Sequence, residues 1–183
     1  MQTESFNTEV TDLAKFLHQA VLDPHLSIEN INAICDASIY FNFAGLCTSL
    51  IRIPLARKRL GANKDTKLIA VIGFPFGDIP HQFKQAQAEW AAEQGAEEFD
   101  VVPNFLELHQ GHINKVADEL AKVCEIGLPT RAIIDATKLN ESCLTLAIEA
   151  SIDAGVRGIQ TGNGFGGKVT IQKIGEMAQL IKG

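Results

Sequence analysis

Three polar side chains recur at one position of a repeated pattern. The pattern pairs a helix-stopping residue with a polar residue five positions later, and its instances are Asn42 with Cys47, Gly95 with Asp100, and Gly155 with Gln160. In a barrel of parallel strands, alternate strands contribute side chains to one interior layer. We therefore expect Cys47, Asp100 and Gln160 to face one another. A chance recurrence of this short spacing is the alternative.

A glycine-rich segment before the last predicted helix has the composition of an anion-binding loop. In GNGFGGK, the backbone amides of Gly164, Gly166 and Gly167 and the ammonium of Lys168 are the groups expected to hold a phosphate. A nucleotide is disfavoured, because the residue after Lys168 is valine, where the nucleotide-binding motif needs Ser or Thr. A plain glycine-rich turn is the alternative.

Charged residues also follow the predicted strands. Asp100 and Asp135 are expected on the same face, and a carboxylate inside a barrel needs a partner such as Arg131. Such a pair is either a structural ion pair or a proton-transfer group. Lys138 is either a relocated reactive amine or an exposed loop lysine.

The elements that must position these residues alternate between strand and helix. The strand-like segments are 17–22, 44–49, 67–74, 99–104, 130–135 and 156–161, and the helical ones are 8–17, 28–35, 54–60, 80–94, 112–125, 140–154 and from 170 onward. Strands that are apolar throughout, separated by helices of roughly 10–15 residues, predict a parallel sheet covered by helices. In such sheets the functional loops follow the carboxyl ends of the strands.

Composition restricts the class of protein. The length of 183 residues predicts one domain, 1–183, and the net charge of −6 argues against partners such as nucleic acid or an anionic membrane. No apolar run is long enough for a membrane span, and no secretory signal is present. The four cysteines lack CxxC spacing, which favours reduced thiols in the cytoplasm. His109 and His112 have no third ligand, so we expect no metal site.

Five separated segments carry a likeness to a known family. They are AGLC with IPLARKRL (44–47, 53–60), AVIGFPFG (70–77), GAEEFDVVPN (95–104), RAIIDAT (131–137) and DAGVRGIQTGNGFGGKVT (153–170). The sequence resembles deoxyribose-phosphate aldolase, a class I aldolase with a βα barrel. The resemblance covers nearly all of the chain from about residue 17, with the segments in the same order and spacing.

The resemblance implies a reversible aldol reaction that joins acetaldehyde and glyceraldehyde 3-phosphate into 2-deoxyribose 5-phosphate. In this chemistry a lysine forms a Schiff base with the carbonyl substrate, and no cofactor is needed. By the same likeness, Asp100 handles protons, Cys47 lines the site, and Lys168 belongs to the phosphate loop. Arg131 stands where the family has a lysine, which keeps the charge but not a titratable amine.

One departure decides the functional prediction. The Schiff-base lysine of the family motif KTSTGF falls on Gln160 in QTGNGF. An amide nitrogen is not a nucleophile, so we expect impaired, altered or absent aldolase activity, and whether the protein is an enzyme stays open. The alternative is a non-catalytic relative that binds a phosphorylated sugar or aldehyde, or serves as an oligomeric scaffold.

A second departure concerns the barrel itself. The chain provides about six of the eight βα units of a TIM-like barrel, which predicts an α/β fold with an incomplete or open barrel. Six strands cannot close with the usual tilt, so the first and last would be edges. An N-terminal helix could cover an edge, the sheet could stay open, or another subunit could pack there. We favour a homo-oligomer.

Overall fold

The computed structural model describes residues 12–62 and 65–182 as an α/β half-barrel. Six parallel strands pair in chain order: β1 (His18–Val21), β2 (Gly45–Thr48), β3 (Lys67–Ile72), β4 (Glu98–Val101), β5 (Thr130–Ile133) and β6 (Gly158–Gln160). The helices are α1 (Ile28–Tyr40), α2 (Ile53–Leu60), α3 (His81–Glu93), α4 (Phe105–His109), α5 (Ile113–Cys124), α6 (Glu141–Asp153) and α7 (Ile171–Lys182), with short 3-10 turns η1 (Leu13–Phe16) and η2 (Leu50–Arg52). The predicted alternation and the parallel sheet are confirmed.

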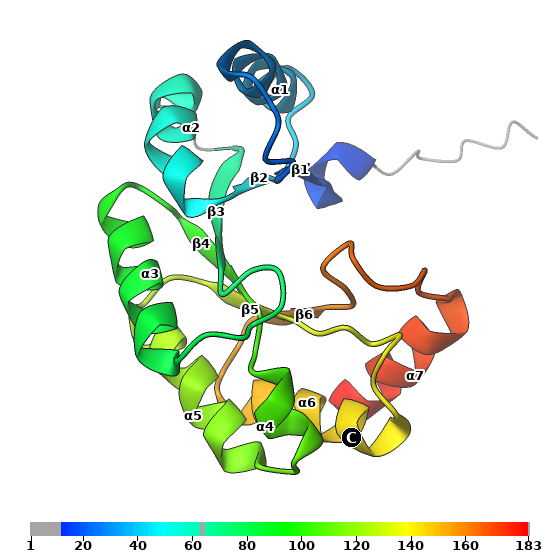
Figure 1. Ribbon diagram of the computed structural model, residues 1–183. Helices are drawn as coiled ribbons and strands as arrows, with labels where there is room; N and C mark the ends of the chain where they lie inside the picture. Colours follow the sequence, from blue (N-terminus) through cyan, green and yellow to red (C-terminus); the bar gives the residue numbers. More distant parts are fainter. Residues whose placement is uncertain (1–11, 63–64, 183) are drawn as a thin grey trace, which may run out of the picture.

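The strands curve while the helices lie on the outside (Figure 1). Within the described residues, β1 pairs only with β2 and β6 only with β5, so the sheet has two edges and does not close. The open barrel expected from six units is therefore confirmed. No helix in the described ranges is long and apolar enough to cross a membrane.

Strand alternation divides the side chains between two faces. Leu46, Leu68 and Phe99 point outward into the main core, which fills the space between the sheet and the helices. Ile69 and Val71 point to the concave face, where they form a small second cluster with Cys47. Because Cys47 pairs with Ile69 and Val71 pairs with Asp100, the register places polar residues on the concave face beside this cluster.

Local signals in the sequence set many of the element boundaries. The Ser27 hydroxyl accepts a hydrogen bond from the Asn30 backbone at 3.2 Å and begins α1, as predicted. The three predicted helix-stopping residues all have positive φ: 53° at Asn42, 94° at Gly95 and 77° at Gly155. These angles explain why asparagine and glycine occupy the stops, since they adopt this conformation most easily.

Some elements differ from the prediction. Helix α4 lies in a segment that was assigned no structure, although the Asn104 side chain accepts from the backbone of Leu106 and Glu107 and begins it. Most predicted strands are longer than the observed ones, because the chain leaves the sheet to enter the carboxyl-end loops. The predicted first helix falls partly outside the described residues, and its described end is the 3-10 turn η1.

A buried ion pair supports the loops at the carboxyl end of the sheet. Lys84 on α3 is fully buried, and its Nζ lies 2.7 Å from Glu119 Oε1 on α5. The same carboxylate oxygen accepts the backbone N–H of Asn104 at 3.0 Å, in the loop after β4. Burial lowers the pKa of Lys84 and raises that of Glu119, and the opposite charge of each partner counteracts this effect. The pair therefore joins two helices to one loop beside the concave face.

Candidate functional site

A cavity of about 330 Å³ lies on the concave face, toward the carboxyl ends of the strands. Cys47 from β2, Asp100 from β4 and Gln160 from β6 all line it, together with His18 and Asn163. The predicted convergence of the three repeat positions is therefore confirmed. Curvature brings these alternate strands together, since Cys47 and Gln160 stand on strands that are not neighbours.

Asp100 is the centre of the polar contacts in this cavity. It is 2 % exposed, and Arg131 on the next strand holds it with two hydrogen bonds, Nε to Oδ1 at 2.8 Å and Nη2 to Oδ2 at 2.9 Å. The thiol of Cys47 donates to Oδ2 at 3.5 Å. Burial, with the negative charge of Asp100, raises the pKa of Cys47 well above its usual value, so the sulfur is a neutral donor.

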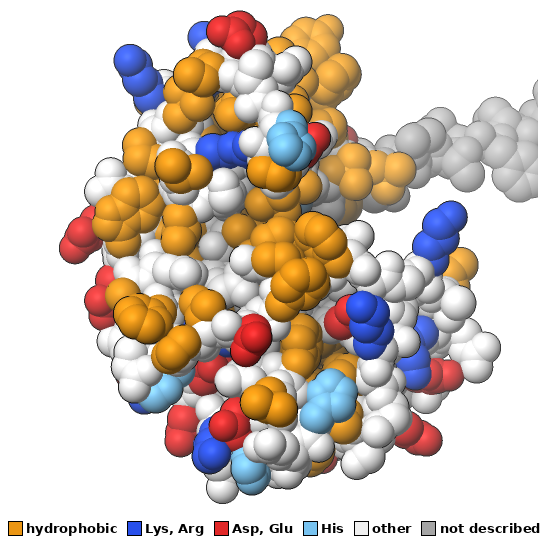
Figure 2. Space-filling model, viewed as in Figure 1, with side chains coloured by type: hydrophobic (Ala, Val, Ile, Leu, Met, Phe, Trp, Pro, Cys, Tyr) orange, Lys and Arg blue, Asp and Glu red, His pale blue; other side chains and the backbone are white. Residues whose placement is uncertain are grey.

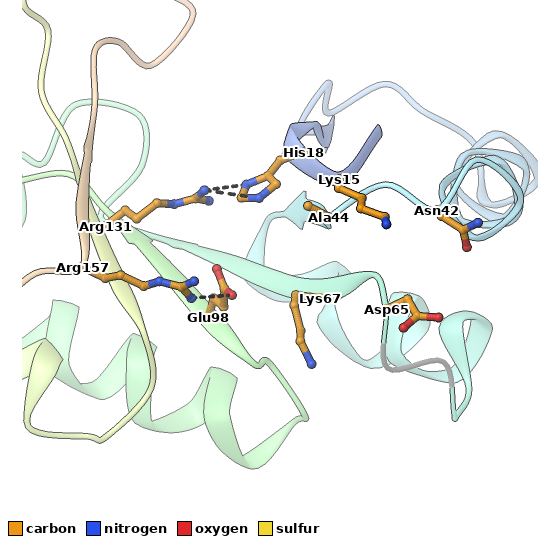
Figure 3. Close-up of a pocket in the computed structure, with 9 residues that line it drawn as sticks. All are labelled: Lys15, His18, Asn42, Ala44, Asp65, Lys67, Glu98, Arg131 and Arg157. Atoms are coloured by element: carbon orange, nitrogen blue, oxygen red, sulfur yellow. Dashed lines mark hydrogen bonds and ion pairs between the residues drawn. The ribbon is translucent and has the colours of Figure 1, made fainter. Parts of the chain in front are cut away.

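His18 reaches the same network from the opposite edge of the half-barrel. Its Nδ1 lies 2.6 Å from Nη1 of Arg131, which joins β1 to β5 across the concave face (Figure 3). Burial, and then the Arg131 charge, lower the pKa of His18, so the neutral ring accepts this hydrogen bond. Sequence reasoning assigned His18 no role, because nothing local in the chain indicates a partner on a distant strand.

Gln160 ends β6 at the rim of the cavity and is exposed. Its Nε2 donates to the Gly162 carbonyl at 3.2 Å, and in the part of the chain that the structure describes its Oε1 accepts no hydrogen bond. Asn163 was also not predicted. It is buried, donates to the Pro75 carbonyl at 2.7 Å and accepts from the Phe165 backbone at 2.9 Å. Asn163 thus ties the glycine-rich loop to the loop after β3.

The predicted phosphate-binding residues do not gather around the cavity. Gly164 lines it, whereas Lys168 is exposed and outside its lining. A side chain on Gly166 would overlap the Asp135 carboxylate, and the Gly167 amide already donates to Thr137 at 3.0 Å. A phosphate at this loop would therefore compete with a carboxylate, and its binding by these residues stays a prediction.

Asp135 has a different partner from the one expected. Its Oδ1 accepts from the Thr137 hydroxyl at 3.0 Å, and Lys138 Nζ lies 3.9 Å from Oδ2. The prediction that Arg131 is the partner is correct for Asp100 and wrong for Asp135. Strand β5 ends before Asp135, and the chain then turns the Asp135 side chain toward the glycine-rich loop. The Lys138 side chain is 65 % exposed and does not line the cavity.

Aromatic side chains lie over the carboxyl-end loops. Phe165 of the glycine-rich loop contacts Phe74 and Phe76 edge-on, with ring centroids 6.0 and 5.6 Å apart. Phe74 also lines the cavity, while Phe76 and Phe165 are more than half exposed. Figure 2 shows hydrophobic side chains grouped at the centre of this face, where Figure 1 has the loop that follows β3. Phe74 therefore forms part of the apolar wall of the cavity, and the other two rings pack beside it.

The described residues hold no cluster of three side chains suited to a metal ion. His109 ends α4, and His112 lies before α5 with its Nδ1 2.5 Å from Glu107. Both histidines are exposed.

The deciding comparison is with proteins of known identity. Deoxyribose-phosphate aldolase from Thermococcus gammatolerans is 33 % identical over 176 residues, covering 93 % of this chain and 78 % of the relative. The enzyme of the same name from Thermococcus kodakarensis is 31 % identical over 176 residues, covering 93 % of this chain and 79 % of the relative. This chain belongs to the deoxyribose-phosphate aldolase family.

Solved structures share the fold of this chain. An aldolase called QR15 matches with a TM-score of 0.89 and 28 % identity, covering 94 % of this chain and 78 % of that one. The tetrameric deoxyribose phosphate aldolase of Aeropyrum pernix shares the fold, with a TM-score of 0.78, 24 % identity, and coverage of 93 % of this chain and 73 % of that one. No protein-family model matches the chain.

The geometry restricts what this member of the aldolase family can do at the cavity. Both oxygens of Asp100 already accept hydrogen bonds from Arg131 and Cys47, so a ligand in the cavity would have to compete for them. The exposed Gln160 amide can exchange hydrogen bonds with a carbonyl or hydroxyl group. None of the described residues that line the cavity is a lysine.

Proposed function

We propose that this aldolase-family protein binds a small phosphorylated sugar or aldehyde without forming an imine at position 160. One observation supports this most directly: Asp100, Cys47 and Gln160 line the cavity, Arg131 is hydrogen-bonded to Asp100, and none of the described lining residues is a lysine. A class I aldol reaction requires a neutral amine that attacks the carbonyl and then draws electrons from the breaking bond. Gln160 supplies hydrogen bonds only.

Residual aldolase activity would need an amine outside the cavity lining. Lys138 stands at the carboxyl end of β5, but its ammonium is exposed and paired loosely with Asp135 at 3.9 Å. This distance and exposure favour an ordinary surface lysine over a reactive one. The proposal is therefore a binding protein with impaired or absent carbon–carbon lyase activity.

We also propose a homo-oligomer, which a scaffold role would require. The edge strands β1 and β6 leave residues such as Ala20 and Gln160 exposed on the concave side. Exposed edges of parallel strands favour pairing or covering by another chain. The name of the Aeropyrum pernix relative describes that protein as a tetramer. Sedimentation equilibrium tests this part, and a monomer at all concentrations would contradict it.

Borohydride trapping tests the absence of an imine. The protein is incubated with acetaldehyde and sodium borohydride, and its mass is measured before and after digestion. We expect no adduct on any peptide from the wild-type chain, and an adduct at position 160 in Gln160→Lys. Gln82→Lys, at an exposed position of α3, controls for nonspecific modification of a new lysine. A wild-type adduct on any lysine peptide, above the level found at the new lysine of Gln82→Lys, would contradict the proposal.

Calorimetric titration tests separately whether the protein binds the sugar. We expect 2-deoxyribose 5-phosphate to bind more tightly than 2-deoxyribose, and Gln160→Leu to weaken binding of both. Replacing the Gln160 amide leaves the ligand with roughly one hydrogen bond fewer, which corresponds to about a three- to tenfold weaker affinity. No heat with either sugar, in a chain that is folded by circular dichroism, would refute a role in sugar binding.

A further inference from the structure

A second cavity lies at the opposite end of the sheet from the site described above. Its volume is about 730 Å³, within the roughly 300–1,000 Å³ range of small-molecule pockets. The amino ends of the strands form its walls, because His18, Lys67 and Glu98 are the first residues of β1, β3 and β4. Arg157 lines it from the position directly before β6, and Arg131 from β5 (Figure 3).

The charge of this cavity is opposite to that of the whole chain. The chain carries a net charge of −6, whereas the lining has four bases, Lys15, Lys67, Arg131 and Arg157, against two acids, Asp65 and Glu98. Cationic side chains that converge on a walled cavity create a local positive potential. The lining therefore favours a ligand with several negative charges.

The contacts that an anion would have to replace are weak ones. Arg157 Nη1 lies 3.4 Å from Glu98, and the Arg157 side chain is 68 % exposed. Lys67 Nζ lies 3.2 Å from Glu97, with the lysine side chain 40 % exposed. The two cations are therefore accessible to a ligand, whereas the carboxylates are less exposed, 14 % at Glu98 and 28 % at Glu97. Glu97 would keep its hydrogen bonds from Arg57 and the Leu68 backbone if Lys67 turned away.

Arg131 can bind an anion in this cavity while it keeps its hydrogen bonds to the buried Asp100. Its Nε and Nη2 hold Asp100, whereas among the described residues Nη1 contacts the neutral ring of His18. A negatively charged oxygen is a stronger acceptor for a guanidinium than a neutral imidazole. Displacing His18 would therefore provide an arginine donor while the Asp100 contact stays in place.

We propose that this amino-end cavity binds a phosphate-bearing small anion, with Arg131 and Arg157 as guanidinium ligands and Lys67 as a further cation. Planar guanidinium groups suit phosphate oxygens because two N–H donors can engage them in parallel. The site is separate from the sugar site proposed above. His18 lines both cavities. An anion bound in the amino-end cavity therefore changes the contact between His18 and Arg131, and through Arg131 it affects the hydrogen bonds of Asp100.

Pyrophosphate is the probe that tests this site, titrated calorimetrically at low ionic strength. We expect wild-type protein to bind it, and Arg157→Gln and Lys67→Gln each to weaken binding by about tenfold, as loss of a charge-assisted contact predicts. Lys168→Gln reports on the competing glycine-rich loop. The matched control is Lys115→Gln, an exposed lysine on α5 that lines neither cavity. Its affinity should stay within about twofold of wild type.

Nuclear magnetic resonance locates the bound anion independently. Pyrophosphate should shift the ring resonances of His18, because the anion displaces the ring from Arg131. Failure of the wild type to bind pyrophosphate would overturn the proposal. So would a loss of affinity in Lys168→Gln with none in Arg157→Gln and Lys67→Gln, since the anion would then be at the glycine-rich loop. Circular dichroism confirms the fold of each variant.

Discussion

Replacing Arg131 by leucine should destabilise the protein by about 3–5 kcal/mol at pH 7, because it leaves a buried carboxylate without its cation. The side chain of Asp100 is 3 % exposed, and the arginine supplies two of its three hydrogen bonds. The Arg131 side chain is 22 % exposed, so water can reach the vacated space. We therefore expect a value of about 3 kcal/mol, at the lower end of that range.

Urea unfolding at pH 7, followed by circular dichroism, measures this loss of stability. The double variant Arg131→Leu with Asp100→Leu is the control, because replacing both charges with apolar groups removes the uncompensated carboxylate. We expect the double variant to be more stable than Arg131→Leu alone. A single-variant deficit below about 1 kcal/mol, or a double variant no more stable than the single one, would refute the claim that Arg131 neutralises a buried Asp100.

Two further predictions concern single positions. The pKa of His18 is lowered in the folded state. The neutral His18 ring therefore stabilises the fold fully above the unfolded-state pKa of about 6.5, and this stabilisation is lost as the pH falls from there through the lower folded-state pKa. Urea titrations at pH 7.5 and 5.5 should show this loss in wild type and a smaller one in His18→Gln; equal losses would place the titrating group elsewhere. Gly166→Ala should cost about 1–3 kcal/mol, because the new methyl group overlaps the Asp135 carboxylate. Gly175→Ala, in an open position of α7, should instead stabilise the protein by about 0.5–1 kcal/mol. Thermal unfolding compares the two variants, and a lower melting temperature for Gly175→Ala than for Gly166→Ala would contradict the described packing.

Much of the fold was predictable because its signals are local. The stops at Asn42, Gly95 and Gly155 depend on backbone conformations that these residue types adopt easily. The five-residue spacing from each stop to a polar residue then placed Cys47, Asp100 and Gln160 on one face. Helix α4 was missed although a local signal exists: Asn104 followed three positions later by Glu107 is the pattern of a helix start.

The partners of the site residues were less predictable, because they depend on distance in space. Arg131 was correctly assigned to Asp100, a neighbour in the sheet, since adjacent strands bring their side chains together. The contact of Arg131 with His18 was not predicted, since it crosses the half-barrel between strands 113 residues apart. The packing of Gly166 against Asp135 likewise depends on how two loops fold onto each other.

By itself the sequence determined the order of strands and helices, the family, and the presence of an amide at position 160. These properties depend on residue type and on neighbours within a few positions. Only the tertiary structure decided that Arg131 is shared between Asp100 and His18, and that the charged groups at the amino ends of the strands line a second cavity. Both follow from the curvature of the sheet, which is a property of all six strands together and brings side chains from distant parts of the chain within hydrogen-bonding distance.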